Sequence, residues 1–280
     1  MFLDRHRDAL LGHGVLYPVT DGTYEASGRS AYAKPKHQWM VAALMAPSDV
    51  SFWQGIDGAL AEAGDGVHTL ILSSEGLFAH WWDFSPAGRA ALSALAARLK
   101  VELWVFFREP QGYIRSEYVQ MLKNPVIGSL CYGRDLSIDE MLDDAWFARR
   151  LDYIGYIRDV QAVLGADAVR LFRYGCDTIS RFMSALGISG LPGESLREHP
   201  TLGEVGTQLL RVINRRTLDA PSKQAVVGLV ERIDAIMGAQ SEPLTFSLDV
   251  RQRIASLAAP SLHALEREFG LYFDSSSGQG

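Results

Sequence analysis

Three short apolar runs constrain the fold of this chain more than any other feature. They cover His68–Ser73, Val101–Phe107 and Ala168–Phe172, and stretches with helical spacing of apolar residues lie between them. A strand that is apolar at successive positions is buried on both faces, which is typical of a parallel sheet covered by helices. Parallel strands also need crossover connections, and helices usually supply them. The sequence therefore predicts a three-layer α/β domain with a parallel sheet.

Helical patterns fill most of the remaining chain. The predicted helices cover Met1–Leu11, Lys36–Met45, Ser51–Ala63, Ser85–Leu99, Pro110–Lys123, Ala145–Leu164, Asp177–Leu186, Thr201–Thr217, Ser222–Met237 and Leu248–Phe269. No strand pattern follows Gly190, and a segment rich in Gly, Pro and Ser precedes the last three helices. We therefore predict a single domain, in which residues 1–188 form the α/β core and residues 189–280 form a mainly helical C-terminal extension.

The charge and cysteine content argue against several classes of protein. The formal net charge of −6 disfavours a general nucleic-acid or membrane-surface binder. Cys131 and Cys176 lie in unrelated contexts, so neither a disulfide framework nor a metal cluster is expected. No apolar run approaches the length of a membrane span, and the charged first eleven residues are unlike a signal peptide. The sequence predicts a soluble cytoplasmic protein without a bound metal.

Several segments, taken in chain order, have the order and spacing of one known family. They are Arg5–Pro18, Leu72–Glu75, Val105–Pro110 with the helix through Ser116, and, more weakly, Val169–Phe172, Phe182–Gly187 and Pro260–Gly270. These segments resemble those of bacterial sulfotransferase-like proteins that use 3′-phosphoadenylyl sulfate. This resemblance implies a P-loop NTPase-like fold of the sulfotransferase type. It also implies transfer of a sulfuryl group to a hydroxyl of a carbohydrate or small metabolite, without a metal.

The resemblance gives a binding role to Arg108 and Ser116. In the family, an arginine at the end of a strand and a serine eight residues later hold the 3′-phosphate of the co-substrate, and Ser116 follows Arg108 at this spacing. An arginine at the carboxyl end of a parallel strand faces the edge where α/β sheets bind ligands, and its guanidinium can take two phosphate oxygens. The next helix start offers free N–H groups, and Ser116 adds a hydroxyl donor. The alternative is that Arg108 pairs with a carboxylate and Ser116 is solvated.

Members of the family begin with a strand and a phosphosulfate-binding loop that have no counterpart in this sequence. The helix that follows the loop corresponds to Phe2–Leu11, and no Lys-Thr-Gly or Gly-Lys-Ser/Thr pattern precedes or replaces it. Because the absent strand is central, we expect a gap in the sheet. Two explanations remain open. Either Met1 is an internal methionine of a longer reading frame, which the intact later segments favour, or the protein is an inactive relative that binds nucleotide or glycan without turnover.

Two residues are candidates for the base that takes the proton from an acceptor hydroxyl. Glu75 follows the first apolar run on the ligand side of the sheet, and a glutamate suits this role where burial raises its pKa. The alternative is that Glu75 caps the next turn or pairs with Arg108. His37 shares an apolar stripe with Met40 and Leu44, and family members often have a histidine there. The alternative for His37 is a hydrogen-bonded core residue.

Other residues have two interpretations each. The sequence His80, Trp81 and Trp82 predicts either a sugar-binding cleft or a packed loop core. Tyr113 and Arg115 either contact the adenine nucleotide or lie on a surface face of their helix. A nucleotide kinase is a further possibility, but it requires a Walker-type loop and Mg²⁺ ligands, and the sequence shows neither.

Overall fold

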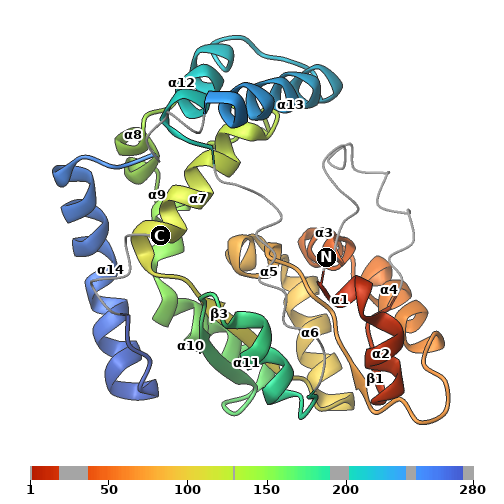
Figure 1. Ribbon diagram of the computed structural model, residues 1–280. Coiled ribbons are helices and arrows are strands. Elements are labelled where there is room, and N and C mark those ends of the chain that lie inside the picture. Colours follow the sequence, from red (N-terminus) through yellow and green to blue (C-terminus); the bar gives the residue numbers. More distant parts are fainter. Residues whose placement is uncertain (1, 19–36, 129, 190–201, 238–243, 274–280) are drawn as a thin grey trace. The chain divides into compact units, whose positions relative to one another are not determined.

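The structure is a computed structural model that describes residues 2–18, 37–128, 130–189, 202–237 and 244–273 of the 280-residue chain (Figure 1). It is 63% helical and contains small parallel sheets. The mixed helix-and-strand class that the sequence predicts is therefore confirmed. None of the described helices combines the length and the apolar character needed to cross a lipid bilayer.

The chain divides into two compact units, and each is described by itself. Unit 1 contains residues 1–106 and 156–198, and unit 2 contains residues 107–155 and 199–280. The boundaries fall within β3 (Leu103–Phe107) and α10 (Tyr153–Leu164). The sequence-based division at residue 188 assigns residues 107–155 to the α/β core. In the structure this segment belongs with the C-terminal helices, because they share one hydrophobic core.

The described strands form two separate pairs. β1 (Val15–Leu16) pairs in parallel with β2 (Thr69–Leu70), and β3 pairs with β4 (Val169–Arg173). Unit 1 also contains α1 (Phe2–Arg5), α2 (Arg7–Gly12), α3 (Gln38–Met45), α4 (Val50–Ala61), α5 (Gly76–Ala79), the 3₁₀ turn η2 (Trp81–Asp83), α6 (Pro86–Arg98), most of α10, and α11 (Thr178–Ala185).

The sequence predicts one parallel sheet with a gap at the absent central strand, whereas the described strands form two separate pairs. The apolar run at residues 68–73 contributes only Thr69 and Leu70 to a strand, and both side chains are half-buried. Within β4 the side chains are likewise half-buried, with Arg170 exposed. Inner strands of an uninterrupted parallel sheet are buried on both faces. β2 and β4 are therefore less buried than the inner strands of such a sheet.

Ser85 connects the start of α6 to the end of α3 by hydrogen bonds. Its hydroxyl oxygen accepts the N–H of Gly88 at 3.0 Å as a helix N-cap, and its own N–H donates to the carbonyl of Leu44 at 3.0 Å. Gly88 lies so close to α3 that a Cβ atom there would stand 2.1 Å from the Leu44 oxygen. A glycine is therefore required at this helix contact.

Unit 2 is helical in its described part. Its elements are α7 (Pro110–Lys123), α8 (Ile138–Asp143), α9 (Ala145–Ala148), the 3₁₀ turn η3 (Arg149–Leu151), α12 (Glu204–Ile213), α13 (Ala220–Met237) and α14 (Leu248–Phe269). Ile114, Tyr118 and Leu122 recur every four residues on α7 and are buried, as expected for the core side of an amphipathic helix. They share a core with Leu210, Val227 and Ile254 from α12, α13 and α14.

The predicted helix over Ala145–Leu164 is interrupted. Asp144 caps α9 by accepting the N–H of Trp146 at 2.8 Å. A second acidic cap follows at Asp152, which accepts the N–H of Gly155 at 2.9 Å. α10 begins at Tyr153, directly after Asp152. Aspartate competes well for the unpaired N–H groups of a helix start, so a second aspartate restarts the helix. The interruption sets Tyr153 as the first residue of α10.

Candidate functional site

Arg108 lies where β3 ends and α7 begins, as the sequence predicts. Its side chain is half-buried. A Cβ atom built on Gly112 would meet Arg108 Cδ at 3.8 Å and Cγ at 3.9 Å. The aliphatic part of the Arg108 side chain therefore lies along the first turn of α7, beside Gly112.

Ser116 is on the same face of α7 as Gly112. Residues four apart in an α-helix lie one above the other, so Ser116 follows Gly112 by one turn. Ser116 is half-buried. Unit 2 contains both residues that the resemblance pairs, with the aliphatic part of Arg108 beside Gly112 and Ser116 one turn further along α7.

The start of α7 does not offer the free N–H groups that the sequence argument expected. Glu109 is the N-cap, and its carboxylate accepts the N–H of Gln111 at 2.9 Å and that of Gly112 at 2.8 Å. Pro110 at the first helical position has no N–H to offer. An anion beside Arg108 would therefore depend on side chains and not on the helix terminus. An acidic residue directly before a helix-starting proline, as at Glu109 and Pro110, is the sequence signal of this cap.

Tyr153 is a further residue beside Arg108 that the sequence does not indicate. Its hydroxyl donates to the backbone carbonyl of Arg108 at 3.1 Å, and its ring stacks on Phe107 with ring centres 4.5 Å apart. The side chain is buried, and burial raises the pKa of its hydroxyl well above 10. Nothing in the local sequence reveals this bond, because 45 residues separate its partners.

His37 has the properties of a hydrogen-bonded core histidine. It is 1% exposed, and its Nδ1 accepts the backbone N–H of Ser73 at 3.0 Å. Nδ1 as acceptor leaves the proton on Nε2, which lies 3.4 Å from the carbonyl oxygen of Pro18. Burial is the main cause that lowers the pKa of His37, so the neutral ring is favoured. Both ring nitrogens serve the packing of unit 1, as the alternative interpretation expected.

Glu75 is exposed at the start of α5, so unit 1 does not give it the burial that a base role requires. The backbone around it is fixed. The Ser74 hydroxyl donates to Gln38 Oε1 at 2.7 Å and accepts the N–H of Gly76 at 3.2 Å. Together with His37, these bonds hold residues 73–76 against the start of α3. Glu75 and His37 thus belong to one cluster in unit 1, whereas Arg108 and Ser116 belong to unit 2.

The aromatic residues after α5 form a packed loop core. Trp81 is buried, and its ring contacts those of Phe84 and Tyr156 at centre distances of 5.4 and 5.6 Å. The Arg89 guanidinium lies 5.2 Å from the centre of the same ring. Trp81 is therefore part of a packed loop core and does not line a sugar-binding cleft. Tyr113 likewise packs against the core of unit 2, and burial raises the pKa of its hydroxyl well above 10.

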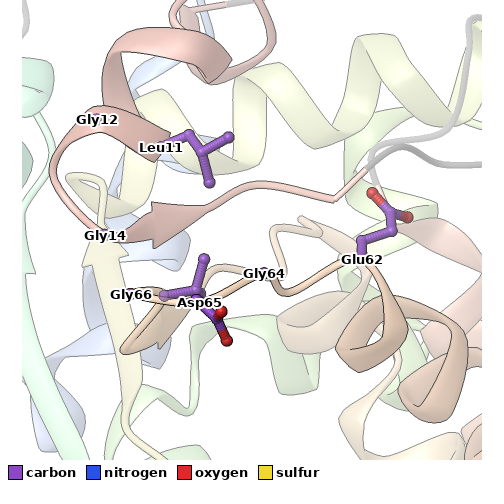
Figure 2. Close-up of a pocket in the computed structure, with 8 residues that line it drawn as sticks. Leu11, Gly12, Gly14, Glu62, Gly64, Asp65 and Gly66 are labelled. Atoms are coloured by element: carbon purple, nitrogen blue, oxygen red, sulfur yellow. The ribbon is translucent and has the colours of Figure 1, made fainter.

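Unit 1 has an open pocket that the sequence did not indicate (Figure 2). Its volume is about 450 Å³. Leu11 reaches it from the end of α2, and the acidic side chains of Glu62 and Asp65 come from the segment after α4 (Figure 2). Two carboxylates repel a phosphate or sulfate. The two acidic side chains therefore make this pocket unsuited to an anionic nucleotide, which requires positive charge.

No metal centre is found in the described ranges, where no three His, Cys, Asp or Glu side chains come together as ligands. Comparison with known proteins gives no relative. No protein-family model matches the chain. Neither the curated proteins nor the solved structures contain a significant match.

Proposed function

We propose that this chain binds 3′-phosphoadenylyl sulfate and is a sulfotransferase acting on a hydroxyl of a carbohydrate or small metabolite. The observation that supports the proposal is that the aliphatic part of the Arg108 side chain, directly after β3, lies beside Gly112, one helical turn before Ser116 in α7. The order of sequence segments that resemble bacterial sulfotransferase-like proteins supports the same function.

The two residues suit a phosphate group. A guanidinium presents paired donors that match two phosphate oxygens, and a serine hydroxyl one turn further along the helix supplies a third. The Glu109 carboxylate also lies beside Gly112, since its Oε2 would be 3.5 Å from a Cβ atom added there, and its two oxygens accept the backbone N–H groups of Gln111 and Gly112. In this proposal Arg108 and Ser116 hold the 3′-phosphate by side-chain hydrogen bonds alone.

Glu75 is the proposed base on the acceptor side, and it gains the burial that this role requires only when a bound acceptor covers it. The bonds from Ser74 to Gln38 and Gly76 fix the backbone next to Glu75. His37 has a positioning role, since it holds Ser73. The co-substrate supplies the sulfuryl group when bound, and Glu75 accepts the proton of the acceptor hydroxyl.

Calorimetry with adenosine 3′,5′-bisphosphate tests the binding step. We expect binding by the wild-type chain and an affinity loss of at least about tenfold in Arg108→Ala, because bonds to a charged phosphate are strong. Ser116→Ala should weaken binding about threefold to tenfold. Arg216→Ala is the control, since it removes an exposed arginine of unit 2 that lies outside α7, and adenosine 5′-diphosphate is the ligand control. Equal affinity in wild type and Arg108→Ala would refute the proposed phosphate contact.

A second candidate function is nucleotide binding without turnover. It is favoured by the exposure of Glu75 and the occupied ring nitrogens of His37. Sulfate transfer from labelled 3′-phosphoadenylyl sulfate to a panel of hydroxyl acceptors separates the two. Transfer that is lost in Glu75→Gln supports the enzyme. Binding of the bisphosphate without any transfer supports the second candidate.

A further inference from the structure

We propose that Tyr153 is a positioning residue for Arg108, and that Ser261 of the C-terminal helix holds Tyr153 in place. This inference rests on the proposed function, because it concerns the same phosphate-binding face of α7. Neither residue would touch the nucleotide. Their role is to fix the backbone from which the Arg108 side chain departs.

The contact between Tyr153 and Arg108 is specific to the hydroxyl group. The Tyr153 hydroxyl donates to the Arg108 carbonyl at 3.1 Å, at the point where the chain leaves β3 and turns into α7. The ring is fixed independently, since it stacks on Phe107 at 4.5 Å with an interplanar angle of 15°. A stacked ring with one anchored hydroxyl leaves little freedom to the backbone of residues 107 and 108.

The same ring also contacts α7. The centre of the Tyr113 ring lies 6.3 Å from that of Tyr153, in an edge-to-face arrangement. Tyr113 is three residues before Ser116 on this helix. Tyr153 therefore contacts the backbone at Arg108 and the helix that carries Ser116. A change at this one side chain would affect the relative placement of both phosphate ligands.

Ser261 fixes the residues on either side of Tyr153. Its hydroxyl accepts the N–H of Ile154 at 3.3 Å and donates to Asp152 Oδ1 at 3.2 Å. Asp152 in turn caps α10 by accepting the N–H of Gly155 at 2.9 Å. Ser261 is 3% exposed, so this buried hydroxyl links α14 to the start of α10 by one accepted and one donated bond. Ser261 thus holds the backbone on both sides of Tyr153, and Tyr153 holds the Arg108 carbonyl.

Tyr118 offers a matched control within the same unit. Its hydroxyl also donates to a backbone carbonyl, that of Leu136, at 3.2 Å, and its side chain is also buried. It lies further along α7 than either proposed phosphate ligand. Tyr118→Phe and Tyr153→Phe therefore each remove one buried hydroxyl bond, and only the second removes a bond to Arg108.

The test is calorimetry with adenosine 3′,5′-bisphosphate on the wild-type chain and on Tyr153→Phe, Tyr118→Phe and Ser261→Ala, with thermal unfolding of each. We expect the Kd to rise about threefold to tenfold in Tyr153→Phe and to be unchanged in Tyr118→Phe, although both lose similar stability. Ser261→Ala should raise the Kd in the same direction by a smaller factor.

The outcomes separate this inference from the proposed function. Binding by wild type, loss in Arg108→Ala and unchanged affinity in Tyr153→Phe would overturn the positioning role alone. Equal weakening in Tyr118→Phe and Tyr153→Phe would also overturn it, because the effect would then follow stability. A wild-type chain that does not bind the bisphosphate would overturn both proposals.

Discussion

The Nδ1 atom of His37 accepts the backbone N–H of Ser73 at 3.0 Å, across 36 residues of sequence. This bond ties the start of α3 to the segment that follows β2. His37 is also the only non-glycine residue in the described ranges with a positive φ, at 43°. A buried side chain with partners on both ring nitrogens can hold a residue in this disfavoured conformation. The arrangement depends on a neutral imidazole, because a protonated Nδ1 has no lone pair to accept a bond.

We predict that stability falls in mild acid because of His37. Burial lowers the pKa of His37 below 6.5, the ordinary value that the unfolded chain retains. Below pH 6.5 the unfolded chain therefore binds a proton that the folded chain does not, and the free energy of unfolding decreases as the pH falls. Above this value both states are neutral, so His37 adds no pH dependence. Urea unfolding between about pH 5 and 8 measures the effect.

His37→Asn is the control for this pH dependence. Asparagine does not titrate and tolerates a positive φ better than most residues. The variant should be less stable than the wild type at neutral pH but should show a shallower decline in acid. Identical slopes in the two proteins would show that His37 is not the responsible group.

Gly88→Ala should destabilise unit 1 strongly. The new Cβ atom would stand 2.1 Å from the Leu44 carbonyl oxygen, which is backbone and cannot turn aside. We expect a loss of about 2 kcal/mol or more, since α3 and α6 must separate. Gly58→Ala in α4 is the matched control, because nothing lies within 4 Å of its Cβ position. That change should stabilise by about 0.5–1 kcal/mol through helix propensity. Similar unfolding midpoints for both variants would contradict the close contact.

Glu109→Ala should weaken the start of α7. The substitution leaves the N–H groups of Gln111 and Gly112 without their carboxylate acceptor. Loss of an N-cap costs about 1 kcal/mol. Glu109→Asp keeps a good capping residue and should retain most of the stability. Chemical denaturation of the two variants distinguishes them, and a wild-type midpoint for Glu109→Ala would mean that the cap contributes nothing.

The sequence predicted those elements whose signals are local. The sequence predicts a strand over Val101–Phe107 and a helix start at Pro110. The structure has a strand over Leu103–Phe107 and a helix from Pro110, because apolar runs and prolines determine the conformation of the residues next to them. The break in the helix after Ala148 was not predicted. Its apolar pattern continues through the break, and the second cap at Asp152 depends on Ser261 as well as on local residues.

The sequence could name the candidate residues of the site but not their surroundings. Ser116 lies on the face of α7 that carries Gly112, which follows from their spacing of four residues once the helix start is known. Their surroundings depend on contacts between distant segments, such as that of Tyr153 with the Arg108 carbonyl. The exposure of Glu75 and the burial of His37 are likewise results of packing, which a single residue pattern does not specify.

The last prediction concerns Lys223, a buried lysine of α13 that is 2% exposed. Its ammonium donates to Asn214 Oδ1, and Asn214 in turn donates to the carbonyl of Leu122 at the end of α7 at 3.1 Å. Burial lowers the pKa of Lys223 from 10.5 to about 8. Between about pH 8 and 10.5 the unfolded chain therefore keeps a proton that the folded chain has lost.

The free energy of unfolding should accordingly rise with pH across this window, and Lys223→Met should abolish the rise. Lys100→Met is the control, because the Lys100 side chain is 87% exposed and has no burial cost to relieve. Denaturant unfolding at several pH values gives the slope for each protein. A slope in Lys223→Met equal to that of the wild type would show that the proton remains on the lysine, and that Asn214 stabilises the charged form more than burial opposes it.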